Sequence, residues 1–573
     1  MRIKHFFGLA VLAAMTASCS SNNDLVNGGN GSGENETGVG YATLSINLPT
    51  TNGTRAAGDP DFKPGDANEY DVKDVTLLIF KEAGKSENDY TFVETADLGT
   101  MAPWVKDDGT TGITTAATIT AKLDKVDLTS KYYALVILNN KDKDNALKVK
   151  MPSTDQEFSK WNVATNAKNL VDNTNGFYMA NAPEFTAGTE PTTLVKIEKI
   201  YATKQAAETN KATTIHVERG MAKVTVASFP TGKAPTGTKY NNDKVDITAW
   251  NLDVTNKSTY PIHKTAGLTS PFTTIWSASS DPAPSTGRFV DGTNTDFKRV
   301  YWGVDPNYDT DLTTVDDCEG NFKVLPADAA ITGDAATPQY CLENTFDIKH
   351  MLQGQTTRVV FKATYTPHGF TPGETFYKIG NNTDLWSKTK LEEQIKAKAL
   401  EVLGEESETN KIEVKLDATE NDIEKTAGTK ILTVANVQHN SANVKPEEIK
   451  AINEKLGLKA ATETDPIVGI ATYASGESYY IARIKHFGND LTSWTEGNET
   501  YGDNDVEHNN KYLGRYGVLR NNWYELTVNS VSGPGTPDVP TIKPKDPDDE
   551  NYTYINVSVK ILDWAKRSQK VDL

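Results

Sequence analysis

The chain carries one run of oxygen-bearing side chains whose spacing could bind a metal ion. These residues are Asp305, Asn307, Asp309, Asp311 and Asp316. Their spacing is similar to that of a calcium-binding loop, in which carboxylate and amide oxygens surround the ion. However, the sixth position is Thr310 rather than Gly, and the twelfth is Asp316 rather than Glu. We therefore interpret the run as an acidic surface loop, with a calcium site as the weaker alternative.

Sequence motifs for catalysis are missing. None of the eight histidines lies in an HExxH motif or another zinc-ligand spacing, and there is no GxSxG motif, Walker loop or dinucleotide fingerprint. Carboxylates are plentiful, but no pair is singled out by its neighbours, so a glycosidase site has no specific support. The formal net charge of -18 argues against nucleic acid or an anionic membrane surface as the main partner. We expect a protein that is not an enzyme and needs no metal ion or cofactor.

Cys19 follows a stretch that is typical of an exported protein. Basic residues open the chain, and the apolar run FFGLAVLAAM comes next. This run is too short to span a membrane as a mature helix, so residues 1–18 are predicted to be a secretory signal. Small residues lead directly to Cys19, as in a bacterial lipoprotein signal, where the cysteine is acylated after cleavage. An ordinary exported protein with a stray cysteine is the alternative, because Thr16 stands where Leu is usual.

Two further cysteines, Cys318 and Cys341, are 23 positions apart. In an oxidising compartment outside the cytoplasm they could form one disulfide bond, and we favour this bond over two free thiols. The sequence does not give the separation of the two Cα atoms that a disulfide requires.

A strand and a protease-sensitive loop are predicted near the N-terminus. In YATLSINL (residues 41–48), one face carries Ala42, Leu44, Ile46 and Leu48. This alternation is typical of a half-buried strand. The loop after it is rich in Gly, Asn, Asp and Pro, and Arg55 is the single basic residue in its first part. An arginine-specific protease that cut between Arg55 and Ala56 would release the first strand, although a lone Arg in a loop is more often a solvated charge.

The C-terminal region looks like a strand that is separated from its domain. Residues 533–551 contain five prolines and little apolar surface, so we expect a semi-rigid spacer. The strand that follows carries on one face Ile555, Val557, Val559 and Ile561, and Trp564 would extend its apolar surface. Such a strand could reach a groove on another molecule. The alternative is that it folds back onto its own domain.

The rest of the chain predicts a mainly β protein. Thr, Val and aromatic residues recur in short runs between loops rich in Pro and Asn, which is typical of β-sandwiches. Two helices are expected in the second half, over residues 389–403 and 446–456. The predicted parts are a signal (1–18), a segment of tether, first strand and propeptide (19–55), an N-terminal β-sandwich (56–230), a C-terminal β-sandwich with a few short helices (231–532), a spacer (533–551) and a C-terminal donor strand (552–573).

Several stretches together resemble the fimbrillins of the type V pilus class, closest to the Mfa-type major shaft subunit. They are TASC ending at Cys19, LPTTNGTRAAGD around Arg55, VERGMAKVTV, CLENTFDIKHMLQGQTTRVVFKATYTP, and YGVLRNNWYELTVNSVSGPGTP before the spacer. The likeness spans nearly the whole chain. Each stretch alone is weakly specific, but the five stretches in this order are hard to reach by chance. The pair Cys318 and Cys341 is not part of this pattern.

The resemblance implies two tandem transthyretin-like β-sandwich domains and a lipidated precursor that reaches the outer membrane, so the membrane is contacted only through the lipid. An arginine-specific protease would remove the segment through Arg55, and the C-terminal strand of the next subunit would fill the groove that opens. The implied partners are further copies of the chain, anchor and tip subunits, the protease, and an adhesion ligand that the sequence does not identify. The implied location is a cell-surface fimbrium. The alternatives are a monomeric surface lipoprotein that binds glycan or host protein, and a tip or anchor subunit.

Overall fold

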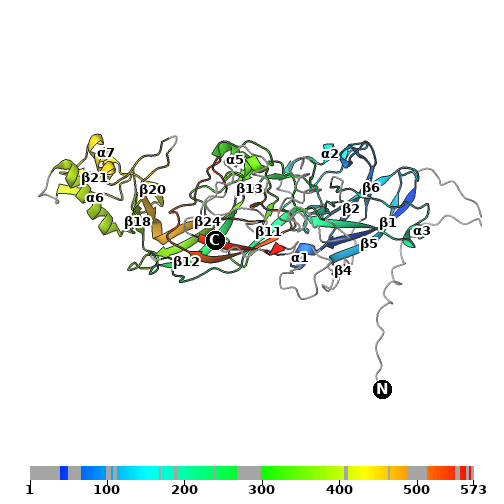
Figure 1. Cartoon of the computed structure of the whole chain (residues 1–573), viewed down its shortest axis with the longest axis horizontal. Coiled ribbons are helices and arrows are strands. Elements are labelled where there is room, and N and C mark those ends of the chain that lie inside the picture. Colours follow the sequence, from blue (N-terminus) through cyan, green and yellow to red (C-terminus); the bar gives the residue numbers. More distant parts are fainter. Residues whose placement is uncertain are drawn as a thin grey trace, which may run out of the picture.

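The computed structural model describes residues 39–49, 66–98, 105–106, 113–166, 170–171, 173–185, 191–237, 239–266, 299–404, 411–462, 465–487, 513–548, 555–562 and 567–568. Strands dominate these residues, so the predicted mainly β fold is confirmed. The molecule is elongated, with the N-terminal strands at one end, the C-terminal sheets in the middle and a lobe with two helices at the other end (Figure 1). The predicted domain boundaries stay predictions.

The N-terminal strands form one sheet. They are β1 (Gly40–Pro49), β2 (Val75–Lys81), β3 (Thr91–Asp97), β4 (Val105–Lys106), β5 (Ile113–Leu123), β6 (Tyr132–Leu138), β8 (Met179–Asn181), β9 (Val195–Lys196) and β10 (Thr213–Arg219). Their order is β3-β2-β6-β8-β10-β1-β5-β4, with β9 paired to β6. The strands β2 and β6 are apolar on both faces, because Leu77 packs in one apolar cluster and Leu78 in another.

Short elements flank this sheet. They are α1 (Ala67–Tyr70), the 3₁₀ turn η1 (Glu87–Asp89), α2 (Phe158–Trp161), β7 (Thr165–Asn166) and α3 (Lys204–Glu208). The second apolar cluster is closed by α2, since Phe158 and Trp161 pack against Phe80 of β2.

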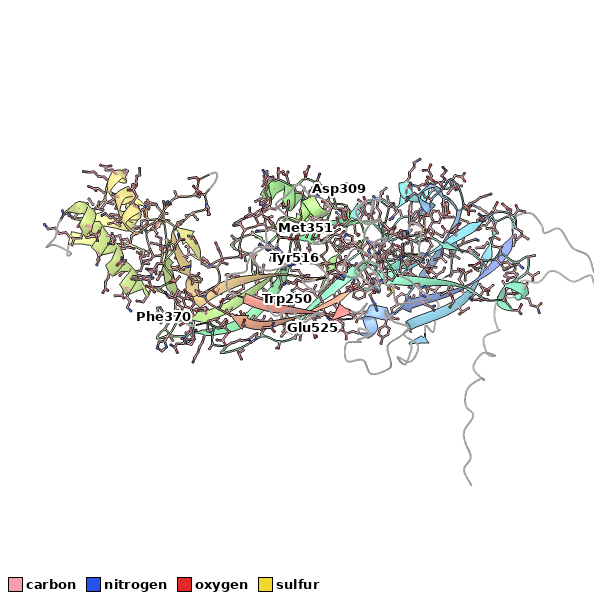
Figure 2. All side chains as sticks on the ribbon, viewed as in Figure 1. Trp250, Asp309, Met351, Phe370, Tyr516 and Glu525 are labelled. Atoms are coloured by element: carbon pink, nitrogen blue, oxygen red, sulfur yellow. The ribbon has the colours of Figure 1, made fainter. Side chains whose placement is uncertain are left out.

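The C-terminal half contains two sheets that pack on a shared core. One has the order β16-β11-β25-β26-β27, from β16 (Gln339–Leu342), β11 (Met221–Val226), β25 (Trp523–Val531), β26 (Ile555–Leu562) and β27 (Arg567–Ser568). The other has the order β12-β17-β24, from β12 (Lys244–Asp253), β17 (Arg358–Thr366) and β24 (Glu477–Arg483). Val224 and Leu526 of the first sheet share an apolar cluster with Trp250 and Phe361 of the second. Figure 2 labels Trp250 among the strands in the middle of the molecule. This arrangement is a β-sandwich.

A lobe is inserted between β17 and β24, although these two strands pair directly with each other. It contains β18 (Phe376–Ile379), α6 (Lys388–Leu403), β19 (Ile412–Val414), β20 (Gly428–Lys430), η6 (Val434–Asn436), β21 (Val437–His439), β22 (Ala442–Asn443), α7 (Pro446–Lys455) and β23 (Ile470–Tyr473). The two predicted helices are present as α6 and α7. The α6 helix begins after the N-cap Ser387 and ends at Gly404 in the left-handed region, with φ 72°. The lobe has an apolar cluster of its own, which includes Leu391 of α6 and Ile452 of α7.

Smaller elements connect the sheets. They are β13 (Thr255–Asn256) with β15 (Phe322–Lys323), β14 (Ser258–Thr259), α5 (Val315–Asn321), η4 (Ile348–His350) and η7 (Ala474–Gly476). The β14 strand pairs with β7 of the N-terminal half, so the chain of the second half returns to the first.

Residues 533–548 do not extend away from the molecule, and the expected free spacer is wrong in this respect. Val539 and Ile542 are buried in apolar clusters of the C-terminal half. The segment satisfies its carbonyl groups with side chains far away in the sequence, since Tyr480 Oη donates to Gly533 O at 3.0 Å and Tyr473 Oη to Gly535 O at 2.7 Å. Prolines remove N–H donors but leave every carbonyl free to accept, so a proline-rich segment can pack without a sheet ladder.

Candidate functional site

The first strand, β1, is an internal strand of the N-terminal sheet and lies between β10 and β5. It pairs antiparallel with β5, from Gly40↔Leu123 to Pro49↔Ile113, and parallel with β10, from Leu44↔Thr213 to Asn47↔His216. Because both edges of β1 are paired, its removal would leave an open lane between β5 and β10. We call this space the β1 lane.

The described side chains on the inward face of β1 are fully buried. Ala42, Leu44 and Ile46 have 0% exposure and pack in the main N-terminal cluster. The strand and alternation predicted for residues 41–48 are therefore observed at these three positions. Leu48 pairs with Thr115 of β5, and its side chain lies outside the described residues. That this strand is displaced remains a proposal.

The start of β1 fits closely against the following chain. Tyr41 exchanges two backbone hydrogen bonds with Tyr201, at 2.7 and 2.8 Å. A Cβ atom on Gly40 would lie 2.3 Å from Ile200 Cγ2, so a larger residue here would force neighbouring side chains to move. The lane is therefore tightly packed at this end.

Several predicted site residues lie outside the part of the chain that the structure describes. They are the lipidation residue Cys19, the cleavage pair Arg55 and Ala56, and Trp564. The chain becomes described again at Asp66, directly before α1. There Glu69 is buried and its Oε1 lies 2.6 Å from Lys223 Nζ, which fixes the segment that follows the predicted cleavage site.

The C-terminal strand β26 pairs with its own chain. It lies antiparallel to β25, from Trp523↔Leu562 to Val531↔Ile555, at the edge of the C-terminal sheet. On its other side only the two residues of β27 pair with it among the described residues. The backbone of Ile555, Val557, Val559 and Ile561 is thus in a strand, as predicted, while their side chains lie outside the description. The single chain has the arrangement that the alternative prediction expected.

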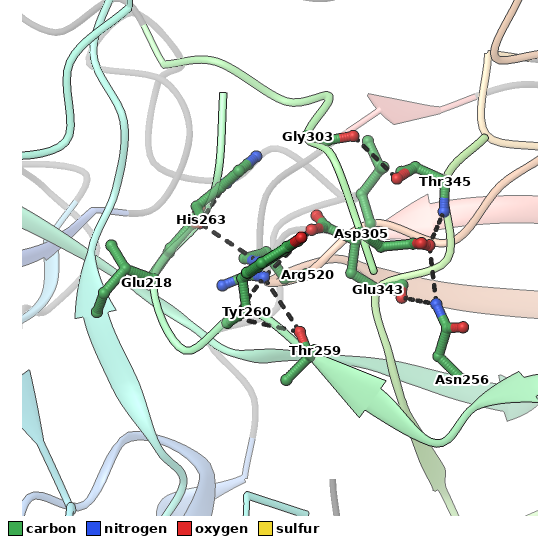
Figure 3. A network of polar contacts seen from close by, with 12 residues as sticks. Glu218, Asn256, Thr259, Tyr260, His263, Gly303, Asp305, Glu343, Thr345 and Arg520 are labelled. Carbon is green, nitrogen blue, oxygen red and sulfur yellow. Dashed lines mark hydrogen bonds and ion pairs between the residues drawn. The ribbon is translucent and has the colours of Figure 1, made fainter. Parts of the chain in front are cut away.

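A buried polar network joins the N-terminal and C-terminal halves (Figure 3). At the end of β10, Glu218 lies 2.6 Å from His263 Nδ1 and 2.9 Å from Arg299 Nη2. Arg520, just before β25, donates to Glu343 at 3.2 Å and to the backbone oxygen of Tyr260 at 3.2 Å. Burial alone would raise the pKa of Glu218, but His263 and Arg299 hold it below its usual value.

The sequence contained a usable signal for this network. Glu218 and Arg219 stand inside VERGMAKVTV, and Arg520 stands in YGVLRNNWYELTV. Charged residues within strands that are otherwise buried need partners. Both stretches also belong to the family resemblance, and their charges were not predicted to meet.

The acidic run at residues 305–316 was expected to be a surface loop, but Asp305 and Asn307 at its start are buried. Asp305 is buried and accepts hydrogen bonds from Asn256 Nδ2 at 2.8 Å and from the backbone N–H of Thr345 at 2.7 Å. Burial raises the pKa of Asp305 to about 7. Asp311 accepts from His350 Nε2 at 3.0 Å. Across the described residues, no group of three or more His, Cys, Asp or Glu side chains could hold a metal ion.

A cavity of about 530 Å³ lies beside this junction, between η1, α2 and residues 260–266. Its wall includes Glu87, whose Oε2 accepts the backbone N–H groups of Thr193 at 2.7 Å and Leu194 at 2.8 Å. Burial raises the pKa of Glu87 to about 7. Because this carboxylate caps two backbone groups, we assign it a structural role rather than a catalytic one.

The expected disulfide bond is wrong for this structure, in which Cys318 and Cys341 are both free and buried. Cys318 lies on α5 and packs with Phe322 and Ile542, whereas Cys341 lies on β16 in the core of the sandwich. The two thiols belong to separate apolar clusters. Burial raises the pKa of Cys318 to about 11 and that of Cys341 to about 12, so neither is a reactive thiolate near neutral pH.

Comparison with protein families gives a match in the C-terminal part of the chain. Residues 471–570 match the family described as major fimbrial subunit protein type IV, fimbrillin, C-terminal. This region contains β24, β25 and β26. No curated protein matches the chain. Within the described residues, every helix is too short or too polar to cross a membrane.

Solved structures give weak likenesses. A proposed cell adhesion protein from Parabacteroides distasonis is 11% identical, with a TM-score of 0.38, over 93% of this chain and 99% of that one. A second proposed cell adhesion protein from the same organism is 12% identical, with a TM-score of 0.32, over 91% and 99%. A fimbrial assembly protein of this organism is 10% identical, with a TM-score of 0.28, over 60% and 93%. Likenesses at these TM-scores support no further conclusion.

Proposed function

We propose that this chain is a fimbrillin, and that it is a shaft subunit that polymerises by strand exchange. The match of residues 471–570 to the C-terminal fimbrillin family supports this proposal. Fimbrillins are structural proteins of cell-surface fimbriae, so the role of the chain is structural and adhesive rather than enzymatic. The finer proposal is that β1 is removed by a protease and that the C-terminal strand of a neighbouring copy takes its place in the β1 lane.

The burial of β1 between two strands carries this proposal. A strand that is paired on both edges can be lost only if another strand replaces it, because the lane would otherwise expose unpaired edges and apolar side chains. Burial of Leu44 and Ile46 alone is worth roughly 3 to 6 kcal/mol. The empty lane is therefore a strong acceptor for a strand with the same alternation.

The C-terminal strand has the required pattern. Its apolar residues recur at every second position, as in β1. They are Ile555, Val557, Val559 and Ile561, and their burial would contribute roughly 6 to 12 kcal/mol before ordering costs. Trp564 would add to this surface if the strand continues.

Strand pairing favours the transfer of β26 from its position beside β25 to the β1 lane of another copy. At home, β26 has one long neighbour, β25, and the two-residue β27. In the lane, a strand has β5 along one edge and β10 along the other. Each additional backbone hydrogen bond adds a net ~0.5 to 1.5 kcal/mol. The pairing of β26 with β25 is intramolecular, however, so its high effective concentration opposes the transfer to another copy.

The precursor has further proposed features. Cys19 carries the lipid that holds the precursor at the outer membrane, and an arginine-specific protease cuts between Arg55 and Ala56. Anchor and tip subunits and an unidentified adhesion ligand complete the set of partners. Head-to-tail exchange does not close on itself, so the product is a filament.

The test uses precursor without residues 1–18, treated with an arginine-specific protease. Assembly is followed by SDS-PAGE without boiling and by negative-stain microscopy. We expect a heat-labile ladder and filaments from the wild type, and monomer from Arg55→Ala and from a chain that ends at Asn551.

A matched pair of variants tests the strand face. Val557→Asp places a charge on the face that would enter the lane, whereas Ser558→Asp places it on the opposite face. We expect assembly to be lost in the first variant and kept in the second. Equal assembly of both variants, or assembly of the chain that ends at Asn551, would refute the donor role.

One observation favours a second candidate, a monomeric surface lipoprotein that binds glycan or host protein. The pairing of β26 with β25 in the same chain is what this candidate requires. Clean cleavage at Arg55 with no assembly at any protein concentration would support it.

A further inference from the structure

We propose that the joint between the N-terminal and C-terminal halves, where β10 leads into β11, is locked at a fixed angle. Each subunit would then be rigid along its length. The proposal for the single chain stands by itself, and its consequence for a filament rests on the proposed function. Relative motion is the usual expectation for two domains that share a small polar interface. Three kinds of contact at this joint argue for a fixed angle instead.

The first contact is the direct connection between β10 of the N-terminal sheet and β11 of the C-terminal sheet. The β10 strand ends at Arg219, and β11 begins at Met221, with only Gly220 between them. Gly220 N donates to Tyr178 O at 2.9 Å, and a Cβ atom on Gly220 would lie 2.9 Å from Tyr178 Cδ1. The residue between these two strands is thus hydrogen-bonded and closely packed, which restricts rotation at this point.

The second contact is a pair of buried charge networks. Glu218 of β10 binds Arg299, and Arg299 Nη2 donates to the backbone oxygen of Arg520 at 3.3 Å. Arg520 in turn binds Glu343 at the end of β16. The side chains of these four residues are at most 3% exposed. The network therefore runs from the N-terminal sheet to the C-terminal sheet without reaching solvent.

The other network lies on the α1 side of the joint. Arg219 Nε donates to Glu69 O at 2.7 Å, and its Nη1 donates to Asn521 Oδ1 at 3.1 Å. The Glu69 carboxylate accepts from Tyr340 Oη at 2.6 Å and pairs with Lys223, whose ammonium lies 3.8 Å from the centre of the Trp523 ring. Residues from α1, β10, β11, β16 and β25 meet here.

The third contact is backbone pairing across the joint. The β14 strand pairs with β7, and Glu184 forms a bridge with Arg299. Asn162 exchanges two hydrogen bonds with the backbone of Ile262, both at 3.0 Å. Bending the joint would break these pairs and would separate buried charges, each of which is costly without its partner.

The locked joint has a mechanical consequence. In a filament built by strand exchange, the incoming strand would lie beside β10, and β10 continues covalently into β11, which pairs with β25. Tension would pass from one subunit to the next through this path. Bending of the filament would then occur between subunits and not within them.

The test measures the distance between the two halves. Spin labels are attached to Leu128→Cys and Lys244→Cys, which are exposed positions in the N-terminal and C-terminal halves. The full precursor without residues 1–18 is used, with Cys19→Ser, and the buried Cys318 and Cys341 are checked for absence of label. Pulsed electron paramagnetic resonance gives the distance distribution.

The joint variants are Glu218→Gln and Glu343→Gln, each of which removes one buried charge at constant size. The control is Asp253→Asn, because Asp253 pairs with Arg358 at 2.8 Å with similar burial but within the C-terminal half. We expect a single narrow distribution in the wild type and the control, and a distribution that is about twice as broad in at least one folded joint variant. A broad wild-type distribution would overturn the proposal, as would folded joint variants that are both as narrow as the wild type.

The filament consequence is tested separately by persistence length in negative-stain images. We expect a shorter persistence length in the joint variants than in the control. If no filaments form from any chain, the proposed function fails, while the distance distributions still decide the locked joint.

Discussion

Replacement of Leu44 by Ala tests whether β1 is a stabilising plug that must leave before assembly. Leu44 lies at the centre of β1, opposite Ile119 of β5 and Thr213 of β10, and has no exposed surface. A Leu to Ala change at a fully buried site costs about 3 to 5 kcal/mol, which combines lost burial and a cavity. We therefore expect Leu44→Ala to lower the free energy of unfolding of the precursor by about 3 kcal/mol.

The same change should ease displacement of β1. A loss of about 3 kcal/mol raises the population of the detached strand by roughly 100-fold, since each 1.4 kcal/mol is a factor of ten. The uncut Leu44→Ala precursor should then form a detectable heat-labile ladder under conditions in which the uncut wild type forms none.

Urea unfolding followed by tryptophan fluorescence measures the stability, and unboiled SDS-PAGE measures the assembly. Ser45→Ala is the matched control, because Ser45 lies on the other face of the same strand and is half-buried. A loss below about 1 kcal/mol in Leu44→Ala, or equal losses in both variants, would refute the reasoning. Destabilisation without any assembly would leave β1 as a core strand and remove its role as a plug.

Three further predictions concern titratable groups and thiols. Burial raises the pKa of Glu87 to about 7, so ionisation of this carboxyl group opposes folding. Its contribution to stability is therefore lost as the pH rises from about 4.5 to 7. We expect Glu87→Gln to show a smaller decrease in Tm between pH 5 and pH 8 than the wild type. Burial would lower the pKa of His350, but Asp347 and Asp311 outweigh it and raise the pKa. The protonated form therefore stabilises the fold at low pH, this stability is lost as the pH rises through the folded-state pKa, and His350→Gln should lower Tm at pH 5.5 more than at pH 8.5. Cys318 and Cys341 should each react with a thiol reagent only after unfolding, and a reducing agent should leave Tm unchanged; a mass that is 2 Da lower than expected for two thiols would contradict this.

Local patterns in the sequence predicted the strands and helices well. The alternation of residues 41–48 gave the inward face of β1, because a strand with one buried face must have a period of two. Gly404 marked the end of α6 and Pro446 marked the start of α7, because helix ends depend on residues within one turn. The N-cap Ser387 starts α6 at Lys388, one residue before the predicted start. These signals lie within a few residues of the element that they define.

The missed features depend on residues far apart in the chain. The segment 533–548 is held by Tyr473 and Tyr480, and nothing in its own composition shows that these donors lie beside it. The joint brings Glu218 to Arg299 and Arg520, which are 81 and 302 positions away in the sequence. The lobe was missed as a separate unit because its helices were visible but the pairing of β17 with β24 around it was not.

The order of the two strand movements follows from their neighbours. If β26 detached from β25 while β1 still filled the lane, every other copy of the chain would also have an occupied lane. The strand would then return to the exposed edge of β25. If β1 left first, the lane would offer two edges to a strand that has one long neighbour at home. Removal of β1 is therefore the step that makes transfer favourable, and spontaneous opening of β26 alone leads nowhere. Control by a protease at the N-terminus is sufficient for this reason, and no separate lock on the C-terminal strand is required.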